Sequence, residues 1–157
     1  MEIVARRYSL QPPANWPFTM FAGQSGPDGS SARSGVWHHG EPSFAGDRAT
    51  MTLIFGEPRQ DRAKSASAEE WCALYDASVA QGMQDFKKEA LEHGTLGGMD
   101  FVRYHWSARK DKQEYKGAFY LAKDGDRVLA FSLTAPVPSD ENAIRLMENA
   151  VLTVRKK

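Results

Sequence analysis

Two adjacent histidines, His38 and His39, are the first side chains in this sequence whose types suggest chemistry. Glu41 and Asp47 follow within a few residues, and imidazole with carboxylate is a ligand set that zinc or iron accepts. Neighbouring residues of a strand point to opposite faces, so the pair can clasp one ion only where the backbone turns. The competing interpretation is a solvated histidine pair on a loop. We predict no metal site and keep the metal site as an alternative.

The third suggestive position is His105, which lies between Arg103 and Ser107 on the polar side of an alternating stretch. Such a histidine could be a general base on the floor of a cleft. The competing interpretation is an exposed sheet face, because no acid or nucleophile is placed beside it by spacing. The sequence also lacks the nucleophile elbow, the zinc protease motif, the Walker sequence and the dinucleotide fingerprint. We therefore predict a protein that is not an enzyme and has no cofactor.

Aromatic side chains are the best candidates for a recognition surface, because tryptophan and phenylalanine are enriched at interface anchors. Two of the four tryptophans, Trp71 and Trp106, fit the pattern of core positions. Trp16 and Trp37 are then free to contact a partner, and Phe44 lies near Trp37 in a polar region. With the charged pair on the 101–109 stretch, the predicted binding residues are the following: Trp16, Trp37, Phe44, Arg103 and His105.

The last third of the chain predicts how the elements are arranged. Residues 101–109 alternate between apolar and polar side chains, whereas residues 118–122 and 128–134 are apolar on both faces and meet at an Asp-Gly turn. A break at Pro138 precedes a helix over 144–154 with apolar side chains at helical spacing. Strands with two apolar faces need cover on both sides.

A second helix supplies that cover. Ser67 and Glu70 form a capping box, and an apolar stripe extends the predicted helix to Phe86. Strands are predicted around residues 51–55 and, within the Gly/Ser-rich region, near 34–38. The fold class is α+β: an α/β/α sandwich with a mostly antiparallel sheet covered by two main helices, in one domain over residues 1–157.

Composition narrows the classes of partner. The 157 residues carry twenty basic and twenty acidic side chains, so no broad field favours nucleic acid or an anionic membrane. The single cysteine, Cys72, excludes an intramolecular disulfide. No segment approaches the length of a membrane span. The expected location is the cytoplasm, or outside it if a signal peptide has been removed.

The order of these features resembles the PsbP-like and DcrB-like proteins. Tyr8-Ser9-Leu10 followed by Pro13-Ala14-Asn15-Trp16 is similar to the opening strand, proline turn and tryptophan of that family. A helix, the turn at Gly97-Gly98, a three-stranded meander and a closing helix follow in the same order. The resemblance implies a sandwich that serves as a binding or adaptor module. Relatives include photosystem subunits, a Ran-binding import factor, envelope lipoproteins and chaperones of type VI secretion effectors.

Three functions follow from these observations. The first is a non-catalytic protein-binding domain, a chaperone or adaptor associated with a bacterial secretion system, which holds a protein partner on an exposed sheet face or near Trp37. The second is a small-ligand or metal-binding protein, conceivably a hydrolase, centred on His38, His39 and His105. The third is a solute-binding protein of the cell envelope. We favour the first, because no catalytic set is assembled by spacing.

Overall fold

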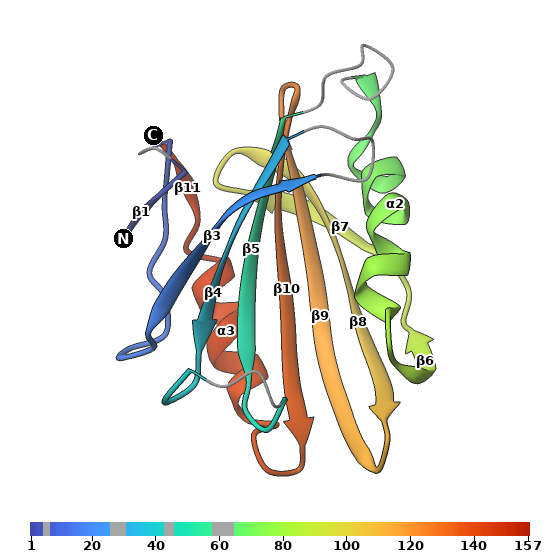
Figure 1. The fold of residues 1–157 in the computed structure, drawn as a ribbon. Coiled ribbons are helices and arrows are strands. Elements are labelled where there is room, and N and C mark those ends of the chain that lie inside the picture. Colours follow the sequence, from blue (N-terminus) through green and yellow to red (C-terminus); the bar gives the residue numbers. More distant parts are fainter. Residues whose placement is uncertain (5–6, 26–30, 43–45, 58–64) are drawn as a thin grey trace.

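A computed structural model of the chain describes residues 1–4, 7–25, 31–42, 46–57 and 65–157, with only the backbone of residues 22–25 and 31–33. Its main feature is a sheet of eight antiparallel strands with one helix on each face (Figure 1). Seven strands lie in the following spatial order: β3 (Phe18–Ser25), β4 (Ser31–His38), β5 (Thr50–Glu57), β10 (Arg127–Val137), β9 (Gln113–Asp124), β8 (Met99–Lys110) and β6 (Gln84–Lys88). The eighth, β7 (Glu92–Leu96), also pairs with β8. The predicted α+β fold class is confirmed.

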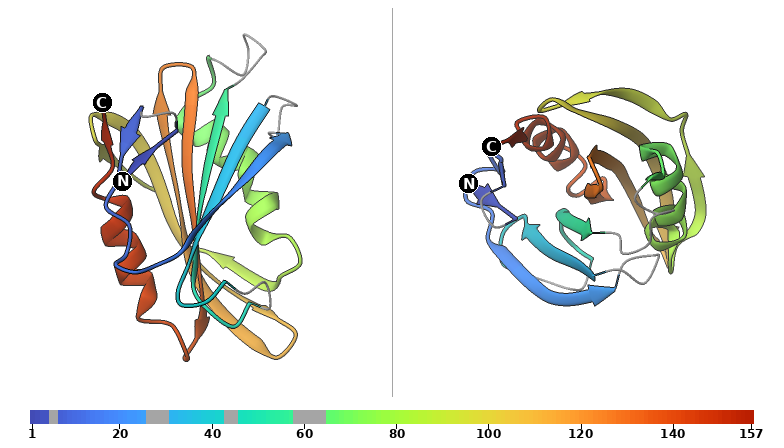
Figure 2. Two further views of the ribbon diagram at one scale, coloured as in Figure 1. Left: turned by 60° about the vertical axis from the view of Figure 1, so that its left-hand side comes forward. Right: turned by 90° about the horizontal axis from the view of Figure 1, so that it is seen from above.

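Two hydrophobic cores lie on opposite faces of this sheet. Strand β9 contributes Tyr120 to one core and its neighbours Phe119 and Leu121 to the other, as alternation along a strand requires. Helix α3 (Ala143–Val151) covers the first core and helix α2 (Ala68–Ala80) the second. Figure 2 shows the two helices on different sides of the curved sheet. Both faces of the central strands are therefore buried.

The meander forms as the sequence pattern predicts. Along β8, Val102, Tyr104 and Trp106 are buried on the α2 side, while Arg103 and His105 are partly exposed on the other side. In the next hairpin, Asp124 pairs with Arg127, which leaves a two-residue turn containing Gly125 at φ 59°. A left-handed backbone at this position suits glycine, which has no side chain to clash.

Helix α2 starts at its predicted capping box but ends six residues earlier than Phe86. The Ser67 hydroxyl accepts from the backbone N–H of Glu70, at 3.1 Å. Gly82 takes a φ of 75°, which stops the helix, and Phe86 belongs to β6. The predicted core position Leu74 is also wrong: it is 49% exposed. Of the helix, Trp71, Cys72 and Tyr75 form the buried stripe instead.

Helix α3 begins at Ala143, one residue before the predicted start at 144, and it buries Met147 and Val151 at helical spacing. Asn142 is its first flanking residue and makes no side-chain capping bond. The Asp140 carboxylate instead accepts the backbone N–H of Ala49, at 2.7 Å. This contact ties the loop before α3 to the start of β5.

A small three-stranded sheet joins the two ends of the chain, in the order β1 (Glu2–Ile3), β2 (Tyr8–Ser9) and β11 (Arg155–Lys156). It lies on the α3 side, where N- and C-termini are close together (Figures 1 and 2). Among the described residues, neither helix has the length and apolar character needed to cross a bilayer. The extent of a single domain over residues 1–157 stays a prediction.

Candidate functional site

Helix α3 and the polar face of β8 meet in five side chains, which we call the β8–α3 cluster: Glu92, Arg103, His105, Tyr120 and Glu148. The Glu148 carboxylate lies 2.5 Å from Nε2 of His105 and accepts the Tyr120 hydroxyl at 2.9 Å. An Arg103 Nη1 group donates to the same hydroxyl oxygen, at 3.2 Å. The cluster therefore connects the helix to two neighbouring strands.

Glu92 of β7 closes the cluster on its outer side. Nη2 of Arg103 donates to the Glu92 carboxylate at 2.9 Å, and Nδ1 of His105 lies 3.7 Å from the same group. The hydrogen bond from Arg103 lowers the pKa of Glu92, which stays ionised. Burial raises the pKa of Tyr120, whose hydroxyl stays protonated and donates to Glu148. Arg103 and Glu92 thus form an ion pair on the outer side of the cluster.

The predicted binding residues Arg103 and His105 are brought together, but their polar groups are occupied by these contacts. Their partners Tyr120 and Glu148 were missed by the sequence reasoning. Glu148 lies 43 residues from His105, and no local spacing links the two. Because the polar groups of the cluster are hydrogen-bonded to one another, they stabilise α3 on the sheet. The cluster contains no nucleophile.

A second polar cluster lies at the far end of β4. Both oxygens of Asp140 approach Nδ1 of His39, at 2.7 and 2.8 Å, and the Trp16 ring stacks on the imidazole with centroids 4.9 Å apart. The Trp16 side chain is 9% exposed, so it is not the free aromatic surface predicted from the sequence. The Trp16 ring instead packs against one face of the His39 ring.

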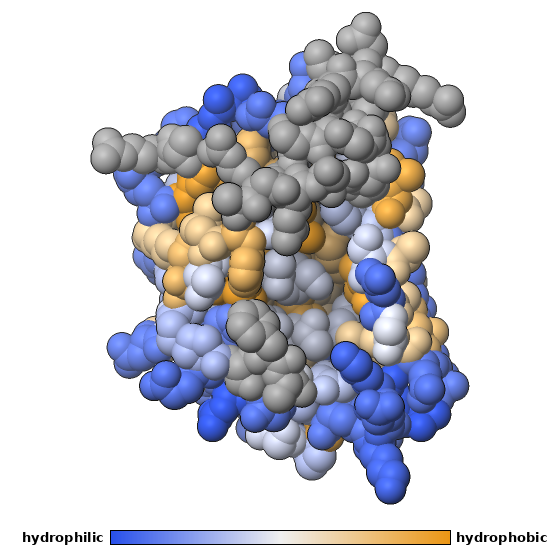
Figure 3. Space-filling model, in the orientation of Figure 1, coloured by the Kyte–Doolittle hydropathy of each residue, from blue (hydrophilic) through white to orange (hydrophobic). Residues whose placement is uncertain are grey.

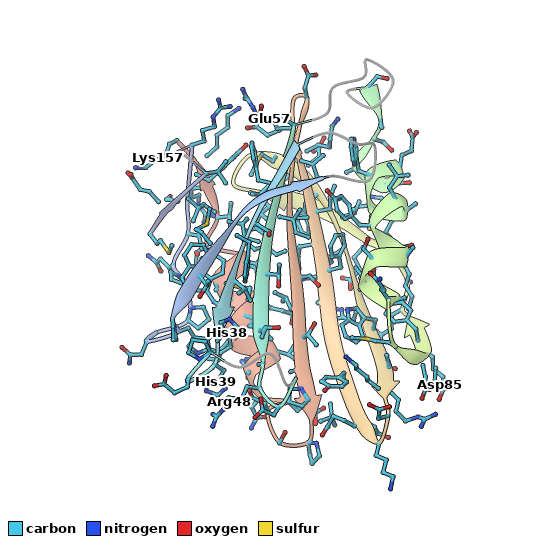
Figure 4. All side chains as sticks on the ribbon, in the orientation of Figure 1. His38, His39, Arg48, Glu57, Asp85 and Lys157 are labelled. Atoms are coloured by element: carbon cyan, nitrogen blue, oxygen red, sulfur yellow. The ribbon has the colours of Figure 1, made fainter. Side chains whose placement is uncertain are left out.

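The three histidines do not share a site. His38 is buried at 2% exposure, whereas the neighbouring His39 side chain is 40% exposed at the lower end of β4 (Figure 4). Strands β4 and β8 are separated by three other strands of the sheet, so His105 lies far from His38 and His39. In the described part of the chain, no three His, Cys, Asp or Glu side chains group to hold a metal. The structure therefore does not bring His38, His39 and His105 into one site.

The sequence places Trp37 in a polar region, free to contact a partner. In the structure, its side chain lies in the buried interior, on strand β4. Its side chain is 0% exposed and stacks on Phe18, with centroids 4.3 Å apart. Trp37 pairs with Met51 across β5, so it faces the α3 core. Its expected exposure is wrong, because the surrounding Gly and Ser residues belong to a strand rather than to a loop. Phe44 lies outside the described residues.

The most apolar hollow, which we call the N-terminal pocket, lies between β1 and the β3–β5 part of the sheet. It has a volume of about 260 Å³ and is lined mainly by the following side chains: Ile3, Val4, Phe18, Met20, Leu53 and Phe55. Met20 is 57% exposed at its rim, the largest exposed fraction among the large hydrophobic side chains described. Figure 3 shows hydrophobic surface on the side of the molecule where β3 lies.

A larger hollow of about 490 Å³ lies over the free end of the β8–β9 hairpin, beside β6. Its charged side chains are largely engaged: Arg109 pairs with Asp85 at 3.1 Å, and Lys116 pairs with Glu141 at 2.7 Å. All four of these side chains are at least 40% exposed, so each pair is weak. This hollow is an ordinary polar surface.

The layers, the strand order and the two helices define a PsbP-like fold. Neither the known family models nor the curated protein sequences match this chain. The solution structure of cyanobacterial PsbP (CyanoP) from Synechocystis sp. PCC 6803 matches with a TM-score of 0.69 at 12% identity, over 100% of this chain and 91% of that chain.

Two further solved structures have the same fold. LpqN, a Mycobacterium tuberculosis protein involved in cell envelope biogenesis, matches with a TM-score of 0.58 at 15% identity, over 94% of this chain and 82% of that chain. PA94, a Pseudomonas aeruginosa protein of unknown function, matches at 0.57 and 12% identity, over 87% of this chain and 94% of that chain. At these identities the similarity establishes the fold, and the predicted PsbP-like resemblance is confirmed at that level.

Proposed function

We propose that this protein is a non-catalytic binding domain that holds a protein partner at the N-terminal pocket. The observation that carries the proposal is the pocket itself: an apolar hollow whose rim residue, Met20, is more than half exposed. The exposed methionine and the hollow lined by Ile3, Leu53 and Phe55 keep apolar surface in contact with water. Covering this surface with another molecule is favourable.

The size of the pocket favours a protein side chain over a free ligand. Sites for small molecules usually enclose about 300 to 1,000 Å³, whereas this pocket encloses about 260 Å³. A phenylalanine or leucine side chain from a partner would fill it as an interface anchor. The same comparison argues against the alternative of an envelope solute-binding protein.

The polar side chains support a binding role over catalysis. Of the ionisable groups that sequence reasoning singled out, Arg103 and His105 are engaged in the β8–α3 cluster, and His39 is engaged by Asp140. Neither cluster lines the N-terminal pocket. A chaperone or adaptor role, including one in bacterial secretion, and a cytoplasmic location are the finer parts of this proposal. They rest on the family resemblance.

Site-specific photocrosslinking in the native host tests the proposal. A photoreactive amino acid replaces Met20, and in the control it replaces Leu74 of α2, which is 49% exposed and far from the pocket. We expect one discrete crosslinked protein from the Met20 position and none from the Leu74 position. Equal labelling from both positions, or none from either, would contradict protein binding at this pocket.

A further inference from the structure

The two edges of the eight-stranded sheet differ in how they are protected against pairing. At one edge, β6 carries Asp85, Lys87 and Lys88, has a register shift against β8, and places Asp85 at φ 53°. Charges and irregularities of this kind keep a second strand away from a sheet edge. The β6 edge is therefore protected against pairing with another strand.

The opposite edge, β3, also has a register shift, between Phe21 and Gln24 against β4, but it carries no charge. Its eight residues read Phe-Thr-Met-Phe-Ala-Gly-Gln-Ser, without a charge or an internal proline. It is the last strand of the sheet among the described residues, and seen from above it lies on the outer rim (Figure 2). Thr19 and Met20 are both exposed there. The uncharged part of the strand before this shift is a template for pairing with another chain.

The hydrogen-bond pattern of β3 shows which groups are offered. The Pro17 carbonyl accepts the His38 N–H, at 3.1 Å, so the main-chain groups of Pro17 and of alternate residues after it point toward β4. The N–H and C=O groups of Phe18 and Met20 consequently point outward. Regular pairing with β4 continues to Phe21, beyond which the register shifts. The regular edge therefore spans Phe18 to Phe21.

We infer that β3 pairs with β3 of a second copy of this chain, antiparallel, with Thr19 opposite Thr19 on a two-fold axis. In this register, the outward backbone N–H and C=O groups of Phe18 in one copy form hydrogen bonds with those of Met20 in the other copy. The two-fold axis repeats the same pair of bonds on its other side. The inference rests on the proposed function, in that it identifies one partner of the same surface. The two eight-stranded sheets become continuous.

Three observations favour a second copy as the occupant. The edge is self-complementary, because the exposed Met20 side chain of one copy lies opposite Phe18 of the other. The β3 segment carries no charge to repel its own image. The chain as a whole has a formal net charge of zero, so two copies approach without long-range repulsion.

Disulfide trapping of Thr19→Cys tests the register. On the axis, Thr19 occupies a non-hydrogen-bonded position, where facing Cα atoms of an antiparallel pair lie about 4.5 Å apart and a disulfide can form. The native Cys72 is buried at 1% exposure and does not interfere. We expect a nearly complete disulfide-linked dimer under mild oxidation, and almost none from the control Leu74→Cys. Equal crosslinking of both variants would overturn the inference.

Sedimentation analysis of a dilution series tests the edge without a covalent bond. We expect a wild-type dimer, a Thr19→Lys variant whose dissociation constant is at least tenfold higher, and recovery when it is mixed with Thr19→Glu. Unchanged thermal unfolding of each variant confirms that it folds. A monomeric wild type at about 100 μM, or a dimer indifferent to Thr19→Lys, would overturn self-pairing. A different protein crosslinked from Met20 would leave the proposed function standing.

Discussion

The side chains of Arg103 and His105 lie on the polar side of β8, where the alternation of the sequence places them. What they contact could not be predicted, because Tyr120 and Glu148 reach them from another strand and from the last helix. Periodicity indicates which face a residue occupies but contains no information on which distant residue shares that face. The same limit applies to His39, whose partner Asp140 looks like a helix cap in the sequence and serves instead as its hydrogen-bond acceptor.

Removing Glu148 tests whether the β8–α3 cluster stabilises the fold. Glu148→Ala leaves the His105 ring and the Tyr120 hydroxyl without their acceptor, and we expect a loss of about 2 kcal/mol in the free energy of unfolding. Glu92→Ala is the matched control, since that carboxylate is 50% exposed and its loss should change little. Urea unfolding at neutral pH measures both. Equal effects of the two variants would contradict the role given to Glu148.

Asp124 supplies a pH-dependent contact between the small sheet and the β9–β10 turn. It accepts hydrogen bonds from the Tyr8 hydroxyl and from Lys156, each at 2.6 Å. Burial opposes ionisation, but the hydrogen bonds from Lys156 and Tyr8 outweigh it and lower the pKa of Asp124. A carboxyl whose pKa is lower in the folded state than in the unfolded state stabilises the fold above the unfolded value, near 4.

We therefore expect the stability difference between wild type and Asp124→Asn to be largest above about pH 5 and to shrink as the pH falls below about 4. Thermal unfolding of both proteins, measured from about pH 3 to about pH 7, gives this difference in stability. A difference that stays constant across this range would show that the ionised form of Asp124 does not carry the contact.

Among the elements, those with a local signal were predicted well. The capping box at Ser67 starts α2, and the Asp-Gly turn joins β9 to β10. The end of α2 was missed, because the apolar side chains after Gly82 fit helical spacing although they belong to β6. Strand β4 was only partly predicted, and Trp37 was misread with it, since Gly and Ser residues before a strand look like a loop.

Among the glycines described, Gly117 of β9 has the closest contacts at its Cβ position. A Cβ atom there would lie 2.1 Å from the Leu133 carbonyl oxygen and 2.3 Å from the Trp106 ring. We expect Gly117→Ala to cost about 3 kcal/mol of stability, since neither backbone nor ring can withdraw without disturbing β10 or the α2 core. Gly56→Ala is the control, because its nearest neighbour is the Tyr75 hydroxyl at 3.7 Å. Similar midpoints in chemical unfolding would contradict the close contact.

At the scale of the whole molecule, the sandwich buries both faces of its central strands and exposes one uncharged edge next to an apolar pocket. The sequence indicated the layers, because strands with two apolar faces require two covering helices. It did not indicate the pocket, which forms only when β1 from one end of the chain lies against β3, β4 and β5. The pocket is a property of the assembled fold, and no single segment forms it.

Partner recovery by affinity purification from the native host tests protein binding at the pocket most directly, with three versions of the full chain: wild type, Met20→Glu and Leu74→Glu. Both substitutions place a carboxylate at a position where about half of the side chain is exposed, so the folded state should tolerate them equally. We predict a stoichiometric partner with wild type and Leu74→Glu that is lost with Met20→Glu. A partner retained by Met20→Glu, or a wild type that recovers neither another protein nor an untagged second copy of this chain, would contradict the proposed function.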